Sequence, residues 1–275
     1  MSAKKPEVSL RRTRIVKVGQ ASLECTLYGS GDALVLLANG GCSTSYFDHF
    51  GQRLTSTGLR IVAINMRGVG SSRGPLEGIT LHDLAADVAG VIEDLDCAPA
   101  HVLGHAFGNR IARCLAADHP ALVRSVILLA AGGLIGPPTP LGSAFRYAGD
   151  AKRGGTECVT VLGARWLSPA SDPSVLASVE CWPTVHIAHL ATSQPTPLDE
   201  WWTAGTAPLL IIQGLDDEAA PSANGHALRD QLGERVHLVD IPHAGHFLVL
   251  EQPDAVIEAV SNFIGGQRRQ GQPIR

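Results

Sequence analysis

The sequence predicts an α/β fold in which a mostly parallel central sheet is flanked by helices. Two observations support this. Six short runs rich in Val, Ile and Leu each end near Gly or polar residues: 33–41, 60–68, 100–108, 124–133, 208–217 and 235–245. Continuous apolar runs of this length are typical of strands buried on both faces. Helical patterns lie between the runs, and such alternation predicts right-handed crossovers in a doubly wound sheet.

Two of the predicted helices have clear start signals. Residues 81–95 carry apolar side chains at i, i+3 and i+4 spacing, and Thr80 with Asp83 has the spacing of a capping box. Residues 255–264 follow Pro253, and proline is favoured in the first turn of a helix. Ligands of doubly wound sheets bind beyond the carboxyl ends of the strands, so we expect a site there.

The region 134–207 interrupts the alternation of strands and helices. It opens with LIGPPTPLG and closes with TAGTAP. We expect residues 1–133 and 208–275 to form the core and 134–207 to form a helical cap. The four tryptophans of the chain all lie in this region: Trp166, Trp182, Trp201 and Trp202. The first three are candidates for an aromatic substrate-binding wall, and the alternative is that they attach the cap to the core.

Composition and charge favour a small-molecule partner. The chain has 275 residues, 45% hydrophobic and 17% charged, which is typical of a globular protein with a sizeable core. A net charge of -4 provides no broad cationic field for nucleic acid or an anionic membrane. The basic N-terminus lacks the apolar stretch of a secretory signal, and no later run reaches the length of a membrane span. We expect a cytoplasmic protein, and the pattern leaves its oligomeric state open.

The cysteines give no sign of a metal site. Cys25, Cys42, Cys97, Cys114, Cys158 and Cys181 are scattered. They form no CxxC pair, and no His/Cys cluster has zinc-ligand spacing. In a chain of this size without a signal peptide, reduced and mostly buried thiols are expected.

Five motifs occur in a fixed order along the chain. They are NGG (39–41), NMRGVGSS (65–72), GHAFG (104–108), GLDDEAAP (214–221) and HAGHFLVLEQP (243–253). In this order, with a cap region after the third, the chain resembles the α/β-hydrolase superfamily from about residue 14 to residue 265. The resemblance implies the α/β-hydrolase fold and activity on a small, apolar carbonyl compound such as an ester or lactone. It implies no metal and no organic cofactor.

The resemblance also assigns roles to individual residues. His246 is expected to be the general base, oriented by Asp217, with Asp216 as the adjacent competitor. The backbone N–H groups of Phe107 and Gly41 are expected to form the oxyanion hole. Asn39 stands where the superfamily commonly has histidine, so the loop is a variant.

Other residues near these motifs are weaker candidates. Asn39, Cys42 and His105 are candidates for substrate contact, and Cys42 for an alternative nucleophile; the alternative for Cys42 is a small buried hydrophobe. Arg67 is expected to brace its turn. Arg110 is a candidate for a structural salt bridge or for a substrate carboxylate contact, with the bridge preferred.

The centre of the motif GHAFG raises the main functional question. The pattern Gly-x-nucleophile-x-Gly places Ala106 where the nucleophile should stand, and a methyl group cannot attack a carbonyl. Three interpretations follow. Ala106 replaces a parental serine of an ordinary serine hydrolase, or it is native and the His246–Asp217 dyad activates water or a substrate proton, as in lyases and cofactor-independent oxygenases. In the third interpretation the protein is a pseudoenzyme that binds a small ligand.

Overall fold

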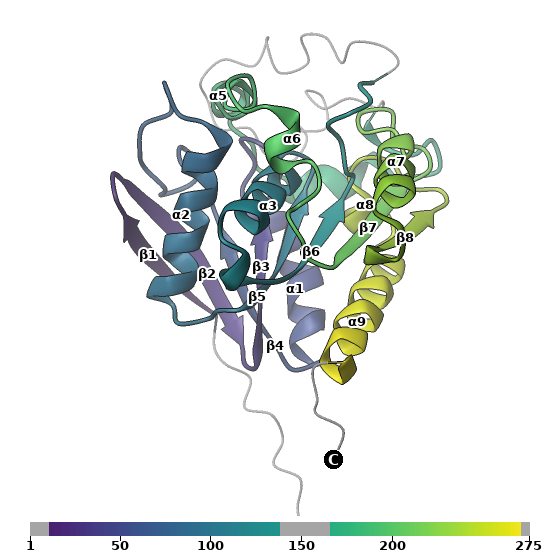
Figure 1. The fold of residues 1–275 in the computed structure, drawn as a ribbon. Helices are drawn as coiled ribbons and strands as arrows, with labels where there is room; N and C mark the ends of the chain where they lie inside the picture. Colours follow the sequence, from purple (N-terminus) through teal and green to yellow (C-terminus); the bar gives the residue numbers. More distant parts are fainter. Residues whose placement is uncertain (1–10, 138–165, 271–275) are drawn as a thin grey trace, which may run out of the picture.

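A computed structural model describes residues 11–137 and 166–270, which contain one eight-stranded sheet with helices on both faces (Figure 1). The strands are β1 (Arg12–Val18), β2 (Ala21–Gly29), β3 (Asp32–Leu37), β4 (Leu59–Ile64), β5 (Ala100–His105), β6 (Val123–Leu129), β7 (Leu209–Gly214) and β8 (Val236–Ile241). Their order in the sheet is β1-β2-β4-β3-β5-β6-β7-β8. The pairings of β1 with β2 and of β2 with β4 are antiparallel, and the others are parallel. The predicted fold class is therefore confirmed.

The α-helices of the described residues are α1 (Asp48–Thr55), α2 (Leu81–Asp94), α3 (Phe107–Asp118), α5 (Pro183–Ala191), α6 (Leu198–Trp201), α7 (Ala223–Leu232), α8 (Leu248–Glu251) and α9 (Pro253–Gln270). The capping box predicted before α2 is confirmed, with Thr80 and Asp83 bonded reciprocally. The six predicted apolar runs coincide with β3 to β8. Strand β1 lacks such a run because most of its residues are exposed in an antiparallel edge ribbon.

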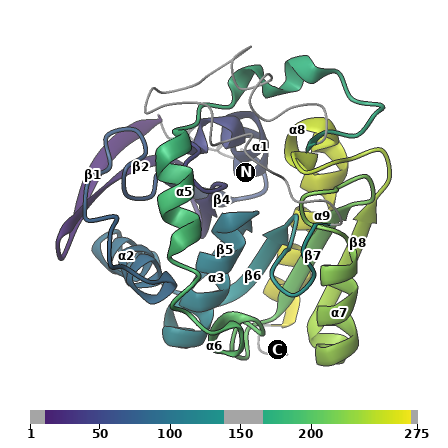
Figure 2. The same cartoon turned by 90° about the horizontal axis from the view of Figure 1, so that it is seen from above.

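Alternating side chains of the parallel strands build two apolar cores. In β3, Val35 and Leu37 pack on the side of α2 and α3, whereas Leu34 and Leu36 pack on the side of α1 and α9. Both sets are fully buried. Because side chains alternate with a period of two, a continuous apolar run supplies both faces of the sheet. Figure 2 shows the two helical layers on opposite sides of the strands.

A buried ion pair joins the turn after β4 to α2. The Arg67 guanidinium donates from Nε to Asp87 Oδ2 at 2.6 Å and from Nη2 to Oδ1 at 2.9 Å. Arg67 also donates to the Pro75 carbonyl at 3.2 Å, which holds the turn. The expected bracing role of Arg67 agrees with these contacts. The Asp87 side chain is buried against Arg67 and is therefore not a solvated charge on the helix surface.

Between β6 and β7 the described residues form η4 (Pro173–Ser178), α5 and α6. Residues 138–165 of the expected cap lie outside the described residues. Helix α5 passes over the carboxyl ends of the parallel strands (Figure 2). The cysteines of the described residues are buried, and Cys158 lies outside those residues. Across 11–137 and 166–270, none of the helices combines the length and apolarity of a membrane span.

The Arg67–Asp87 pair should contribute strongly to stability. Asp87→Asn leaves a buried guanidinium without its counter-charge, and we expect a loss of about 3–5 kcal/mol in the free energy of unfolding. Asp94→Asn, which breaks the exposed pair with Arg14, should cost less than about 1 kcal/mol. Urea unfolding followed by circular dichroism measures both. Equal losses in the two variants would contradict the prediction.

Candidate active site

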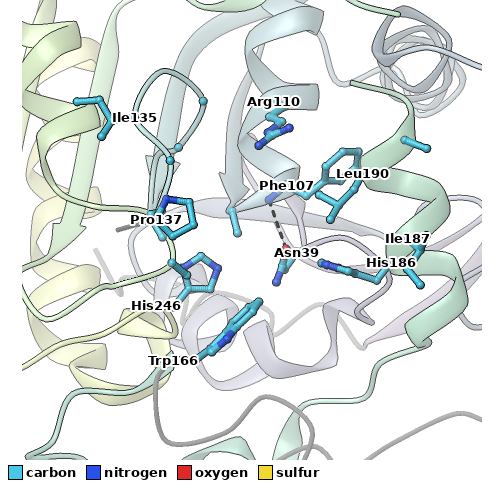
Figure 3. Close-up of a pocket in the computed structure, with 18 of the residues that line it drawn as sticks. Asn39, Phe107, Arg110, Ile135, Pro137, Trp166, His186, Ile187, Leu190 and His246 are labelled. Atoms are coloured by element: carbon cyan, nitrogen blue, oxygen red, sulfur yellow. Dashed lines mark hydrogen bonds between the residues drawn. The ribbon is translucent and has the colours of Figure 1, made fainter. Parts of the chain in front are cut away.

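The functional motifs meet at the carboxyl edge of the sheet. Asn39 follows β3, Ala106 follows β5, Asp217 follows β7 and His246 follows β8. A cavity of about 640 Å³ opens there, and Asn39, Ala106 and His246 line it. Figure 3 shows Asn39, His246 and Trp166 around one end of this cavity. Loops at the carboxyl ends of parallel strands are where doubly wound sheets bind ligands.

The turn from β5 into α3 has the geometry of a nucleophile elbow. Ala106 has φ 51° and ψ −109°, a conformation that costs a non-glycine residue about 1–3 kcal/mol. A Cβ on Gly104 would lie 2.3 Å from the Gly108 carbonyl oxygen, and a Cβ on Gly108 would lie 2.4 Å from that of Leu37. The two glycines are therefore required by close backbone approach. The turn directs the Ala106 methyl group to the cavity wall.

Asp217 and His246 form a buried hydrogen-bonded pair. His246 Nδ1 lies 2.9 Å from Asp217 Oδ2 and 3.2 Å from Oδ1, and both side chains are buried. The carboxylate also accepts from the N–H groups of Ala219 and Ala220, at 2.8 and 2.9 Å, which fixes its orientation. With Nδ1 protonated toward Asp217, Nε2 is the basic nitrogen. Asp216 instead accepts from the Ser168 hydroxyl at 2.6 Å.

The Asn39 side chain occupies the point where two backbone donors converge. Its Oδ1 accepts from Gly40 N–H at 2.8 Å and from Phe107 N–H at 3.4 Å. The oxygen must face these donors, because the amide nitrogen would bring hydrogens together. Asn39 is 4% exposed, and its Nδ2 has no hydrogen-bond partner within residues 11–137 and 166–270. Asn39 Oδ1 therefore occupies both backbone donors, and the Asn39 amide nitrogen lies buried beside them.

The Gly41 N–H group, expected in the oxyanion hole, is instead bonded to a histidine of α5. This N–H donates to His189 Nδ1 at 3.1 Å, and His189 Nε2 in turn donates to the Arg67 carbonyl at 2.8 Å. A Cβ on Gly41 would lie 2.5 Å from the backbone nitrogen of His186, so α5 packs directly on this loop. The structure therefore directs Gly40, rather than the expected Gly41, toward the same acceptor as Phe107.

His105 connects two loops of the site and does not line the cavity. It is fully buried, with Nδ1 at 2.7 Å from the Tyr46 hydroxyl and Nε2 at 2.7 Å from the His246 carbonyl. The carbonyl accepts, so Nε2 carries the hydrogen and Nδ1 accepts from Tyr46. The Tyr46 hydroxyl also accepts from Asn39 N–H at 2.9 Å. The chain of bonds joins the Asn39 loop to the His246 loop.

The remaining candidates divide into two groups. Trp166 lines the cavity, with its ring edge-on to His246 at 4.8 Å between centroids. Three others lie outside the lining: Cys42, Trp182 and Trp201. Cys42 belongs to the core cluster beneath the loop, where burial raises its thiol pKa well above the usual value. Trp182 N–H donates to the Gly41 carbonyl at 2.7 Å, and Trp201 packs against Arg113 at 4.5 Å.

Two histidines of α5 were not singled out by the sequence. His186 lines the cavity, and its Nδ1 donates to the Gly40 carbonyl at 2.7 Å. His189 stacks on Phe107 with ring centroids 5.5 Å apart. Their i, i+3 spacing places both on one face of a helix, and this spacing was the sequence pattern that could have indicated them as site residues.

One group of potential metal ligands lies outside the cavity lining. Among the described residues, His82, Cys114 and Asp118 form the one cluster of three or more whose ligand atoms lie within 4.8 Å of one another. His82 Nδ1 is 2.7 Å from Asp118 Oδ2, and Nε2 is 2.7 Å from Glu200 Oε2. These bonds join α2, α3 and α6, and none of the four residues is part of the cavity lining.

Buried histidines should make the protein sensitive to acid. Burial lowers the pKa of His101, His186 and His189 to about 4 and that of His105 to about 3. The unfolded chain binds these protons near pH 6.5, so the unfolded state gains protons first as the pH falls. Between pH 7 and pH 5 we expect the free energy of unfolding to fall by about 1–2 kcal/mol for each histidine.

Urea unfolding at pH 7, 6 and 5 measures this dependence. His101→Gln, which changes a strand residue away from the cavity, should remove one histidine's share of the slope. A flat profile between pH 7 and pH 5 would refute the prediction.

Known proteins are similar to this chain over most of its length. The "Putative non-heme bromoperoxidase BpoC" of Mycobacterium tuberculosis is 28% identical over 262 residues, 86% of this chain and 94% of the relative. The 2-(acetamidomethylene)succinate hydrolase of Mesorhizobium japonicum is 26% identical over 265 residues, 92% and 95% of the two chains. A crystal structure of E-2-(acetamidomethylene)succinate hydrolase superposes with a TM-score of 0.77, at 22% identity over 93% of this chain and 100% of that one, which shows the common fold.

A model of the alpha/beta hydrolase family matches residues 35–259, a range that contains the motifs GHAFG (104–108), GLDDEAAP (214–221) and HAGHFLVLEQP (243–253). With the fold and the order of motifs, this match identifies the chain as a member of the α/β-hydrolase family.

Proposed function

We propose that this protein hydrolyses a small ester, lactone or related carbonyl compound, with His246 as general base and water as the attacking group. The observation that carries the proposal is the 2.9 Å bond between His246 Nδ1 and Asp217 Oδ2 at a cavity that Ala106 also lines. Asp217 orients the ring and stabilises the positive charge that it acquires. One relative being named a hydrolase supports this reaction class.

The proposed reaction needs no covalent enzyme intermediate. His246 Nε2 takes a proton from water while the water oxygen bonds to the carbonyl carbon. The bond from that carbon to the leaving oxygen then breaks, and His246 returns the proton to the leaving oxygen. A methyl group at Ala106 is smaller than the hydroxymethyl group of serine, which leaves room for water. We propose that residues 134–207 act as a cap over this reaction, since α5 contributes Leu190 to the cavity wall.

A second candidate is a non-hydrolytic reaction of the lyase or cofactor-independent oxygenase type, in which His246 takes a proton directly from the substrate. One observation favours it: Asn39 Oδ1 already accepts from both Gly40 and Phe107 N–H. A tetrahedral oxyanion would have to displace this oxygen, whereas Asn39 Nδ2 can donate to a less charged substrate oxygen. A purely ligand-binding role is less favoured, because it does not require an oriented base.

The proposal makes the dyad essential. We expect His246→Gln and Asp217→Asn each to lower kcat for short p-nitrophenyl esters or lactones by about 10²–10⁴-fold. Asp216→Asn is the matched control, since it changes the adjacent carboxylate, which accepts from Ser168, and it should retain activity within a few-fold. If Asp216→Asn were as damaging as Asp217→Asn, the assignment of the dyad would be wrong.

The position of Asn39 predicts how a restored serine behaves. Ala106→Ser alone should raise ester hydrolysis less than about 10-fold, because Asn39 occupies the backbone donors. The double variant Ala106→Ser with Asn39→Gly should increase the rate of ester hydrolysis by a further factor of about 10², because the backbone donors that Asn39 occupies can then bind the oxyanion. Adding His246→Gln to this variant should abolish the increase. Burst kinetics and mass spectrometry of the acyl-enzyme provide the measurements. A large gain from Ala106→Ser alone would show that Asn39 does not block the oxyanion site.

A further inference from the structure

Arg110 lies on the wall of the cavity, one helical turn after the elbow. Residues four apart on a helix share a face, so Arg110 of α3 projects from the same side as Ala106. Both residues line the cavity. In Figure 3 Arg110 lies beyond Phe107, on the side away from Trp166. Its guanidinium therefore stands at a distance from the His246 end of the cavity.

No counter-charge compensates this arginine within the described part of the chain. No carboxylate there forms an ion pair with Arg110, and the described cavity lining contains no Asp or Glu. The Arg110 guanidinium lies over the Trp201 ring, 5.7 Å from the ring centroid. The preferred expectation of a structural salt bridge at Arg110 finds no partner among residues 11–137 and 166–268.

Two neighbouring basic side chains, Arg113 and His186, add no positive charge to the described cavity wall. Arg113, three residues further along α3, is fully buried among neutral groups: it donates to Asn109 Oδ1 at 2.6 Å and to the Gly132 carbonyl. Burial lowers the pKa of His186 to about 4, so this lining residue is neutral near pH 7. Arg110 thus gives the described wall a fixed positive charge.

Stability of the fold does not account for this placement. A cation in the first turn of α3 faces the positive end of the helix dipole, which is unfavourable. The Arg110 side chain is half-buried, and partial burial of an unpaired guanidinium is also costly; desolvation lowers the Arg110 pKa from its ordinary value. A residue kept at a cost to stability in a cavity beside an oriented base is typical of a ligand-binding group.

We propose that the substrate carries a carboxylate group, which Arg110 binds through its guanidinium while the reacting carbonyl lies beside His246 and Asn39. The inference rests on the proposed function and specifies its substrate class: a small carbonyl compound with an apolar body and one anionic end. The apolar body packs against walls such as Trp166, Leu190 and Ile135. The planar guanidinium matches a carboxylate bidentately, and binding in a desolvated cavity strengthens the pair.

Binding of matched acids and amides tests the proposal without any turnover. Acetate, phenylacetate and 4-phenylbutyrate are compared with acetamide, phenylacetamide and 4-phenylbutyramide by isothermal titration calorimetry and NMR shift perturbation. The wild-type protein should bind at least one acid 10-fold or more tightly than its amide. Arg110→Gln should abolish this preference and leave amide binding within about 3-fold, and Arg110→Lys should retain part of it. Arg124→Gln, which removes an exposed arginine, should keep the preference.

Thermal unfolding of the same variants excludes a merely structural role. Arg110→Gln should unfold at or above the wild-type temperature, because it removes a half-buried charge that has no ion-pair partner among the described residues. The proposal is overturned if no acid is preferred by the wild-type protein, or if Arg110→Gln keeps the preference. His246-dependent hydrolysis of neutral esters without acid preference would support the proposed function and overturn this inference alone. Tighter binding of the acids than of the amides, without any hydrolysis, would support this inference and overturn the proposed function.

Discussion

The candidate site depends on a buried chain of hydrogen bonds that joins the Asn39 loop to the His246 loop at the carboxyl edge of the sheet. Asn39 N–H donates to Tyr46, the Tyr46 hydroxyl donates to His105, and His105 donates to the His246 carbonyl. Each member is buried, so breaking one bond would leave a polar group unsatisfied away from water. Burial lowers the pKa of His105 to about 3, which keeps the ring neutral and its two bonds in one direction.

The same edge is held by close backbone contact. The glycines of the elbow allow α3 to begin against β3, and the strained backbone of Ala106 follows from that approach. A chain that had lost all use of this turn could relieve the strain with glycine at the centre. The elbow geometry, the oriented His246 and the desolvated Arg110 occur together around one cavity. Features that lower the stability of a fold are typical of functional sites, and their grouping around one cavity supports chemistry at this position.

The electrostatic character of the site comes from its desolvation. His186 and His189 are neutral near pH 7 because burial disfavours their charged forms. Helix α5 brings both rings to the loop after β3, where His189 takes the Gly41 N–H and His186 donates to the Gly40 carbonyl. These two backbone groups of the loop are thereby paired. In the proposed function, the Asn39 amide, His246 and Arg110 are the groups that contact the polar parts of the substrate.

The sequence alone determined the parts of this protein that depend on neighbouring residues. Apolar runs marked the parallel strands, Thr80 and Asp83 marked the start of α2, and motif spacing selected Asp217 and His246, which the fold brings within 2.9 Å. Tertiary structure alone decided which distant groups meet. Examples are the pairing of Asp87 with Arg67, the capture of Gly41 N–H by α5, and the orientation of the Asn39 amide. Hydrogen bonds and desolvation depend on atoms supplied by segments far apart in the chain, and no local pattern of residues specifies them.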